Sequence, residues 1–415
     1  MKRALAFLLF TAVFPVASLF AADPASTNNV SLPNGFKYEV LVEGDIPEPV
    51  DLDFAPDGRL WFTSRRGFIW AYDFKSKSKK EIAHIQVPFE QIKGKENNER
   101  GLHGMEFDPN FSKNGYVYLH YATLTGDLFT NRVSRFTFKN DQLVAGSEKI
   151  YLQIPSTRGY HQGGVIEYNK KDGKLYISTG DNNVSNETKK FFDDPNNPPQ
   201  NLGDLRGKVL RLNLDGTIPK DNPFVNTPGA RPEIFTYGHR NPYSMNIDPK
   251  TGNVYVGEVG FDGNEAIEEI NFIKPGGNYG WPRCSGNNQG TFGGDCPIKD
   301  AISPWIMYVH QQGGASITSG PFYRDNGVKN SFPKEWRDGM FYADYSRKWI
   351  RFAKVNPADN SVITNVPFGR GFGGPLSMKQ GPDGALYFNE YGGWFTGSPK
   401  DRLSRIVYTG EGVVK

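Results

Sequence analysis

The sequence predicts an all-β fold, a six-bladed β-propeller, and three observations carry this prediction. Aromatic residues make up 14% of the 415 residues, and 47 glycines and 29 prolines can supply tight turns between short strands. The apolar residues show no long helical periodicity. A short phrase, a turn with Asp or Gly followed by alternating apolar residues, recurs six times along the chain.

The six copies of this phrase each predict one turn that leads into one strand. Repeats at this spacing indicate a solenoid, a propeller or an array, and ring closure favours the propeller because it protects the sheet edges. Their spacing is uneven, so we expect long insertions in blades three to five. The strands 38–42 and 403–408 are expected to share one blade and close the ring. The copies are Phe54–Thr63, Asp108–Leu119, Lys171–Ser178, Asp248–Val256, Arg337–Ala343 and Gly381–Phe388.

The N-terminus predicts a signal peptide at residues 1–22, followed by a single propeller domain at residues 23–415. Lys2 and Arg3 precede an apolar run that ends before Pro15, and small residues follow at 21 and 22. A membrane anchor is the alternative, but the run is short for a spanning helix. We therefore expect a periplasmic or secreted protein with no transmembrane segment. The net charge of only +3 gives no sign of nucleic-acid binding.

The two cysteines, Cys284 and Cys296, lie in one stretch rich in Gly and Asn. In an oxidising compartment a disulfide between them is expected, with two free thiols as the alternative. A metal site at the cysteines is disfavoured, because no second cysteine pair or nearby His accompanies them.

Three polar residues are candidates for chemistry. His161 lies beside a Gly pair before a predicted strand, where an imidazole could serve as a general base, although a single His is more often structural. Arg240 and Asn241 follow another predicted strand, and an Arg there could hold an anion by a two-pronged contact. The alternative is a turn with a solvated Arg.

An acidic cluster follows in residues 260–270. Glu268 and Glu269, with Glu265 and Asp262 nearby, offer the hard oxygen ligands that calcium prefers. The spacing is not that of an EF-hand, so a solvated acidic loop is the alternative.

Five segments together resemble the soluble pyrroloquinoline quinone (PQQ)-dependent glucose and aldose sugar dehydrogenases, also called the glucose/sorbosone dehydrogenase family. They occur in the family's order, and the resemblance extends over residues 30 to 410. It implies a six-bladed propeller, in agreement with the repeat count. The segments are Gly101–Phe111, His161–Gly164, Gly207–Pro223, Gly238–Pro242 and Asn278–Pro282.

The resemblance also implies roles for the candidate residues. His161 falls where the family has its general base, and Arg240 and Asn241 fall where it contacts the cofactor PQQ. Glu99 replaces a Gln that the family brings to the cofactor. These residues would serve oxidation of a sugar, with electrons passed to an external acceptor.

A calcium site is implied in the same way. Gly260 and Phe261 fall where backbone carbonyls hold Ca²⁺ beneath the quinone, and Glu269 and the carbonyl of Tyr279 fall at a further calcium position. Ca²⁺ there would polarise the quinone carbonyl.

The sequence departs from the family where a Lys and an Arg-x-Arg pair normally meet the carboxylates of PQQ. The aligned positions are near Ser346, Gly374 and Leu376, none of which is cationic. A site short of these cations would bind PQQ weakly. A glycan- or protein-binding propeller without PQQ is therefore the alternative function. A calcium-dependent lactonase is a third, which His161 and Arg240 do not suit. Possible replacements for the cations are Arg347, Lys348 and Arg370.

Overall fold

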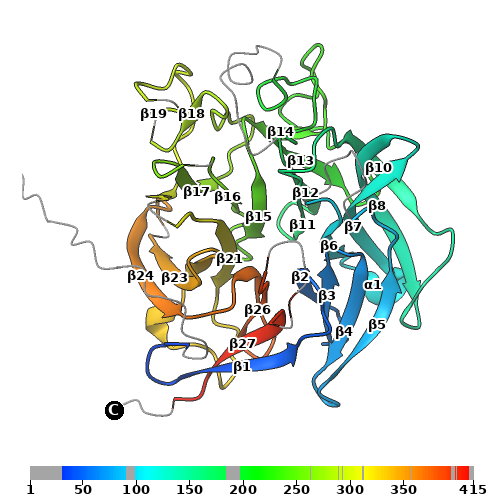
Figure 1. Ribbon diagram of the computed structural model, residues 1–415, viewed down its shortest axis with the longest axis vertical. Helices are drawn as coiled ribbons and strands as arrows, with labels where there is room; N and C mark the ends of the chain where they lie inside the picture. The colour runs from blue at the N-terminus through cyan, green and yellow to red at the C-terminus, as the bar shows by residue number, and fades with distance from the viewer. Residues whose placement is uncertain are drawn as a thin grey trace, which may run out of the picture.

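The strands form six separate blades around a central axis (Figure 1), which confirms the predicted six-bladed β-propeller. This is a computed structural model. It describes residues 30–89, 99–183, 197–261, 263–287, 289–291, 293–310, 313–356, 358–393, 398 and 400–410. The expected signal peptide at residues 1–22 lies outside the described residues.

Each blade is an antiparallel sheet whose strands follow one another from the axis outward. Blade 1 consists of β2 (Pro49–Phe54), β3 (Leu60–Ser64), β4 (Phe68–Asp73) and β5 (Ser78–His84). Blade 2 consists of β6 (Leu102–Phe107), β7 (Tyr116–Thr125), β8 (Leu128–Lys139) and β10 (Lys149–Pro155), and β9 (Gln142–Leu143) pairs with β8. Blade 3 consists of β11 (Gly163–Asn169), β12 (Lys174–Thr179), β13 (Lys208–Asn213) and β14 (Ile234–Tyr237).

The second half of the chain builds the other blades. Blade 4 consists of β15 (Pro242–Ile247), β16 (Val254–Glu258), β17 (Ile267–Phe272) and β20 (Ile306–Val309). Blade 5 consists of β21 (Ile317–Tyr323), β22 (Gly339–Asp344), β23 (Trp349–Val355) and β24 (Val362–Arg370). Blade 6 consists of β25 (Pro375–Gln380), β26 (Leu386–Glu390), β27 (Arg402–Tyr408) and β1 (Phe36–Glu43). The remaining elements are β18 (Cys284–Ser285), β19 (Gln289–Gly290), α1 (Phe111–Asn114) and the 3₁₀ turn Lys334–Trp336.

The ring is closed twice. The innermost strands β2, β6, β11, β15, β21 and β25 contact one another in turn, and β25 contacts β2 again. In addition, β1 pairs with β27 from Phe36↔Tyr408 to Glu43↔Arg402. The N-terminal strand is therefore the outer strand of the last blade, as the sequence predicted.

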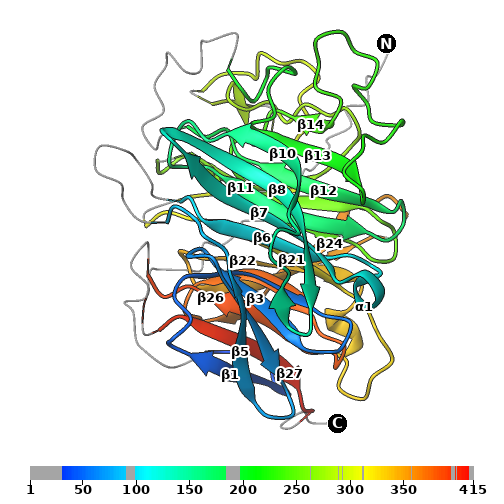
Figure 2. The ribbon, with the colours of Figure 1, turned by 90° about the vertical axis from the view of Figure 1, so that its right-hand side faces the viewer.

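The recurring phrase forms the turn between the first and second strands of each blade. Asp248 shows how, since its carboxylate accepts the amide of Lys250 at 3.0 Å and the hydroxyl of Thr251 at 2.8 Å between β15 and β16. Gly252 completes this turn with a φ of 79°, which a residue without a Cβ adopts at little cost. The second copy also contains α1, which lies at one end of the blade 2 strands in Figure 2.

The hydrophobic core is divided among the six interfaces between neighbouring blades. Each interface has its own cluster, for example Trp61 of blade 1 packed with Phe107 and Phe138 of blade 2. The other five clusters join blades 2 and 3, 3 and 4, 4 and 5, 5 and 6, and 6 and 1. Each blade therefore buries both faces, which leaves its strand ends to carry the polar sites.

The axis is lined by charged groups. Lys379 of blade 6 bonds Glu167 of blade 3 at 2.6 Å, so this ion pair joins two opposite blades. Burial raises the pKa of Asp51 to about 6 and that of Glu167 to about 7, and it raises the pKa of Glu106 as well. Burial acts to lower the pKa of Lys379, but the carboxylates around it, with Glu167 and Asp53 foremost, raise it overall.

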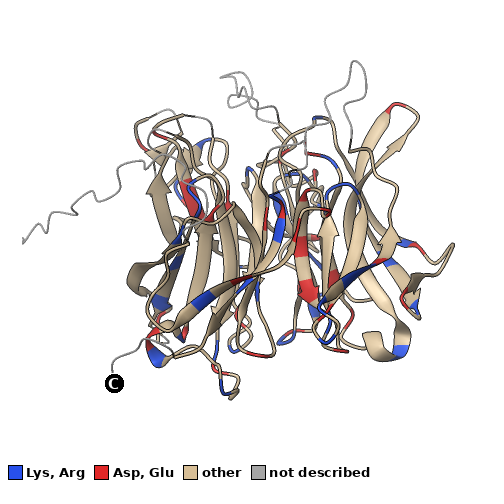
Figure 3. Cartoon of the chain, turned by 60° about the horizontal axis from the view of Figure 1, so that its bottom comes forward, with Lys and Arg blue, Asp and Glu red and all other residues tan. Residues whose placement is uncertain are grey.

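The strand ends opposite the recurring turns converge on one face. The Glu99 carboxylate, before β6, accepts the amide of His161 before β11 at 2.6 Å. The Asn241 side-chain oxygen, before β15, accepts the amide of Gly163 at 3.2 Å. Elsewhere both signs of charge are interspersed over the ring (Figure 3). No helix in the described part of the chain is long and apolar enough to cross a membrane.

Candidate active site

One pocket in blade 4 collects five of the residues that the sequence singled out. They come from the loop before β15, the loop after β16, strand β17 and the loop that follows it. The pocket is therefore built almost wholly by one blade. These five residues are Arg240, Gly260, Phe261, Glu269 and Tyr279, and the wall also includes Glu258, Trp281 and Cys284.

His161 lies beside this pocket, and its ring is held by an acidic partner. Its Nδ1 is 2.7 Å from the Asp181 carboxylate, which also accepts the Trp281 indole N–H at 2.8 Å. His161 is only 5% exposed and has a φ of 52°, a left-handed conformation that is uncommon for a residue with a side chain. Such conformations persist where the surroundings hold them, and they concentrate at functional sites.

Glu99 supplies part of that support. Its carboxylate accepts the backbone amide of His161, which fixes the unusual turn. Burial raises the pKa of Glu99, against the favourable charges of His161 and Arg240. Glu99 is thus a close acidic neighbour of both His161 and Arg240. Its predicted contact with a cofactor stays a prediction.

Arg240 lies between Trp281 and the backbone of the Gly260 loop. Its Nη1 donates to the Val259 carbonyl at 3.0 Å, and its guanidinium carbon lies 5.6 Å from the centre of the Trp281 ring. The Arg240 carbonyl accepts the Asp181 amide at 2.8 Å, so the segment that carries the acidic partner of His161 is directly bonded to the segment that carries the arginine. His161 and Arg240 therefore share one site.

Glu258 organises the backbone of this segment. Its carboxylate accepts the amides of Arg240 and of Asn241, the latter at 3.2 Å, and bonds Nδ1 of His239 at 2.7 Å. The His239 ring stacks on Tyr279 with centroids 4.7 Å apart. Glu258 is 6% exposed, so these donors replace water around its charge.

Two buried carboxylates face each other in the pocket. Glu258 of β16 is paired in register with Glu269 of β17, and the Asn271 amide donates to Glu269 at 3.1 Å. Burial, followed by the charge of Glu258, raises the pKa of Glu269 to about 7. The Asn271 side-chain oxygen is buried without a hydrogen-bond donor. Two buried acidic groups in one pocket are the surroundings that a hard cation would complete.

The predicted calcium residues fit such a cation. Gly260, Phe261 and Tyr279 line the same pocket as Glu258 and Glu269. Within the described residues, no three His, Cys, Asp or Glu side chains are close enough to hold a metal ion by themselves. Any cation here would therefore depend on carbonyl oxygens as well as on carboxylates.

The rest of the predicted acidic cluster does not join the pocket wall. Glu268 is fully buried and acts as an anchor, because it accepts the amides of Gly260 at 2.9 Å and of Ile317 at 2.6 Å and bonds His310 at 2.5 Å. It thereby ties the Gly260 loop to blade 5. Glu265 is exposed, and Asp262 lies outside the described residues.

Two of the three positions where the family normally has cations, Gly374 and Leu376, adjoin an aromatic cluster instead. Leu376 packs with Tyr345 and Tyr391, whose ring centres are 6.0 Å apart, and with Tyr243. At Gly374, an added Cβ would lie 2.8 Å from the Tyr345 ring. Of the three proposed replacements, Arg347 donates to the carbonyls of Gly314 and Val309, and Lys348 and Arg370 are exposed.

The site thus fits a quinone at one end better than at the other. The end with His161, Arg240 and the Gly260 loop offers an imidazole held by a carboxylate, a guanidinium and two buried acidic residues. The end near Tyr345 and Tyr391 offers aromatic rings where PQQ would present carboxylates.

Two residues of the site escaped the sequence prediction, Asp181 and Glu258. Asp181 follows the end of β12 by two residues, and Glu258 is the last residue of β16. Both acidic residues lie at the end of the second strand of a blade. The second strand ends on the same face of the ring where the innermost strands begin, so this position could have predicted both residues.

Comparison with known proteins defines the class. The model of the glucose/sorbosone dehydrogenase family matches residues 46–393. The chain therefore belongs to the glucose/sorbosone dehydrogenase family, as its motifs suggested.

Individual relatives agree with this assignment. Quinoprotein glucose dehydrogenase B of Acinetobacter calcoaceticus is 30% identical over 287 residues, which cover 65% of this chain and 57% of that protein. Aldose sugar dehydrogenase YliI of Escherichia coli is 28% identical over 300 residues, covering 69% of this chain and 73% of that protein. An uncharacterized protein of Synechocystis is 28% identical over 375 residues, covering 87% and 86% of the two chains.

Solved structures show the same fold. A Thermus glucose dehydrogenase-type oxidoreductase superposes with a TM-score of 0.71 at 27% identity, covering 90% of this chain and all (100%) of the other. The PQQ-bound aldose sugar dehydrogenase of Streptomyces coelicolor superposes with a TM-score of 0.67 at 22% identity, covering 91% and 99% of the two chains. At that identity the second match supports the fold alone.

Proposed function

We propose that this protein is a PQQ-dependent aldose sugar dehydrogenase, which oxidises the anomeric hydroxyl of a sugar to a lactone and passes the electrons to an external acceptor. The observation that carries the proposal is the bonded pair of His161 and Asp181 directly beside Arg240. A base, its orienting carboxylate and a fixed guanidinium are what removal of a hydroxyl proton with hydride transfer requires.

Each residue has a defined task in this reaction. His161 accepts the proton of the anomeric hydroxyl, and Asp181 holds the imidazole in place and stabilises the imidazolium that forms. The carboxylate of Glu99 adds a second negative charge near that imidazolium. Arg240 and Asn241 orient the electron acceptor and balance the negative charge that grows on it. PQQ, when bound, supplies the two-electron acceptor.

A calcium ion belongs to this proposal. The carbonyls of Gly260, Phe261 and Tyr279, together with Glu269, would hold it. Support comes from the Glu258–Glu269 pair, two buried carboxylates on neighbouring strands in the wall of one pocket. Ca²⁺, when bound, supplies Lewis-acid polarisation of a carbonyl oxygen.

The location proposed is the periplasm or the extracellular space. Two observations support it: the signal-like residues 1–22 and the Cys284–Cys296 disulfide, a bond that persists in oxidising compartments.

A glycan- or protein-binding propeller without PQQ is the second candidate. The aromatic cluster of Tyr243, Tyr345, Leu376 and Tyr391 favours it, because this cluster occupies positions where cations would meet the carboxylates of PQQ. A further relative adds support: human Hedgehog-interacting protein is 28% identical over 235 residues, covering 52% of this chain and 32% of that protein.

A dye-reduction assay separates the two candidates. Purified protein is loaded with PQQ and Ca²⁺ and tested with a panel of aldoses, with His161→Gln as the matched control. The enzyme proposal expects sugar-dependent dye reduction that the His161→Gln variant loses by at least a hundredfold. Absence of reduction with every sugar would refute it and favour the binding role.

A further inference from the structure

We infer that the loop closed by the Cys284–Cys296 disulfide is a positioning element of the cation pocket, so that cation binding requires the oxidised disulfide. This inference rests on the proposed cation site. The disulfide joins two residues that are 12 positions apart, in the insertion between β17 and β20 of blade 4. It confirms the pairing that the sequence predicted.

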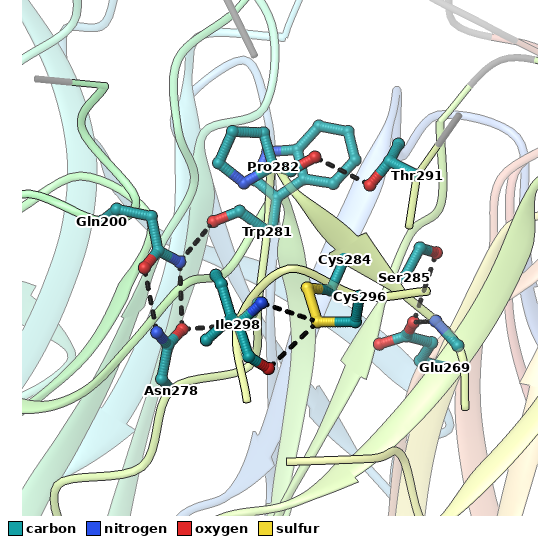
Figure 4. The surroundings of a disulfide bond; sticks show 12 residues. Gln200, Glu269, Asn278, Trp281, Pro282, Cys284, Ser285, Thr291, Cys296 and Ile298 are labelled. Atoms are coloured by element: carbon teal, nitrogen blue, oxygen red, sulfur yellow. Dashed lines mark hydrogen bonds between the residues drawn. A yellow bond between two sulfur atoms is a disulfide. The ribbon is translucent and has the colours of Figure 1, made fainter. Parts of the chain in front are cut away.

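The loop reaches Glu269 directly. Oε1 of Glu269 accepts the Ser285 hydroxyl at 3.5 Å (Figure 4). It also accepts the Gly286 amide at 2.5 Å, while Oε2 accepts the Asn271 amide at 3.1 Å. Cys284 itself lies in the pocket wall and is 4% exposed. Two of the three donors that orient this carboxylate therefore follow the first cysteine immediately.

Apart from the disulfide, the same loop is held by hydrogen bonds rather than by a hydrophobic cluster, for example from the Cys284 amide to the Gly280 carbonyl at 3.0 Å and from the Thr291 amide to the Arg283 carbonyl at 3.1 Å. Among the described residues, no hydrophobic cluster of the ring includes a residue between 283 and 301. Its own secondary structure is the pairing of two-residue strands β18 and β19, and Thr291 bonds the Pro282 carbonyl at 2.7 Å. A segment without a core depends on its crosslink to stay ordered.

Gly286 shows how closely the loop approaches strand β17. Its φ is 61°, and an added Cβ would lie 2.5 Å from Cδ1 of Ile267 on β17. A branched side chain is strained at this φ and would push the loop away from the strand that carries Glu269. This position therefore offers a way to displace the loop while the disulfide stays intact.

The disulfide can be reached by a reductant. Cys296 is half-buried, in contrast to Cys284, and its sulfur contacts the backbone of Ile298. A dithiol such as dithiothreitol would give two electrons and two protons to the pair, which breaks the S–S bond and yields two thiols, while the dithiol closes to its own disulfide. Release of the loop removes the Gly286 and Ser285 donors from Glu269.

The test measures cation affinity without PQQ or substrate. Tb³⁺ luminescence, sensitised by Trp281 in the pocket wall, is titrated and then displaced with Ca²⁺. We expect Ca²⁺ affinity to fall at least tenfold in the Cys284→Ser/Cys296→Ser variant and in Gly286→Val. The exposed Lys299→Ala variant, next to the crosslink, should match the wild type. Circular dichroism checks that each variant keeps its β-sheet.

A double-mutant cycle that combines Glu269→Gln with removal of the disulfide shows whether the loop acts through the Glu269 carboxylate. In the Glu269→Gln background, removal of the disulfide should change the residual affinity less than twofold. If wild-type and disulfide-free proteins bind Ca²⁺ equally well, the inference is wrong while the cation site stands. If the oxidised wild type binds no cation, the cation site and this inference both fall.

Discussion

Replacement of Asp181 by Asn tests the assignment of the base most sharply. The Asp181 carboxylate accepts three donors: Nδ1 of His161 at 2.7 Å, the Trp281 indole at 2.8 Å and the Asn183 amide at 2.9 Å. An Asn side chain is nearly the same size but has one acceptor oxygen and one NH₂ group. It must therefore turn an N–H toward one of these donors, and it cannot balance the charge of an imidazolium.

The expected losses of kcat and of stability in Asp181→Asn follow from these contacts. A buried hydrogen bond to a charged group contributes about 3 kcal/mol at most, and its loss from the transition state corresponds to roughly a hundredfold lower kcat. Stability should fall by about 1–3 kcal/mol, since one buried donor loses its acceptor. The assay is steady-state dye reduction with saturating PQQ, Ca²⁺ and sugar, with urea unfolding of the same samples.

The matched control is Asp204→Asn. Asp204 is near the same face, but its carboxylate pairs with Arg206 at 2.6 Å and is 21% exposed, so its loss should leave kcat unchanged. A kcat within twofold of the wild type for Asp181→Asn would refute the role of this carboxylate, and with it the assignment of His161 as base.

Three further predictions concern charge and orientation. Lys379→Met should lower the free energy of unfolding by about 3–5 kcal/mol in urea titrations, because it leaves the buried Glu167 carboxylate at the axis without its cationic partner. A decrease below about 1 kcal/mol would contradict this. Burial raises the pKa of Glu269 from the ordinary value of 4.5 to about 7. The protonated Glu269 side chain therefore stabilises the folded protein below pH 4.5, and this stabilisation is lost as the pH rises through 7. Without Ca²⁺, the Glu269 carboxyl should therefore make the free energy of unfolding about 3 kcal/mol lower at pH 8 than at pH 4.5. The Glu269→Gln variant should lose this part of the pH dependence of the free energy of unfolding. Trp281→Phe, which keeps a ring but loses the N–H to Asp181, should lower kcat/KM about fivefold in dye reduction, and an unchanged value would contradict the orienting role.

The fold could be predicted because its information is local. Each recurring phrase, such as the Asp248 turn, contains both the turn residues and the start of the strand that follows. The pairing of β1 with β27 also followed from the sequence, since a ring of six blades leaves two terminal strands to share one sheet.

The site could be predicted only in part, because much of it is not local. Arg240, Gly260, Phe261, Glu269 and Tyr279 were recognised through family motifs and line one pocket. Asp181 and Glu258 were missed, since each acts through partners distant in sequence, such as Trp281 at 100 positions from Asp181. The replacement of cations by aromatic packing around Leu376 likewise depends on tyrosines from separate strands.

The most direct test of the account is a PQQ titration followed by absorbance or calorimetry, with and without Ca²⁺, on the wild type and on Arg240→Ala. We expect saturable binding that needs Ca²⁺ and weakens more than tenfold in Arg240→Ala, which is over 1.4 kcal/mol. PQQ that fails to bind, or that binds equally well without Ca²⁺ and without the guanidinium, would contradict it.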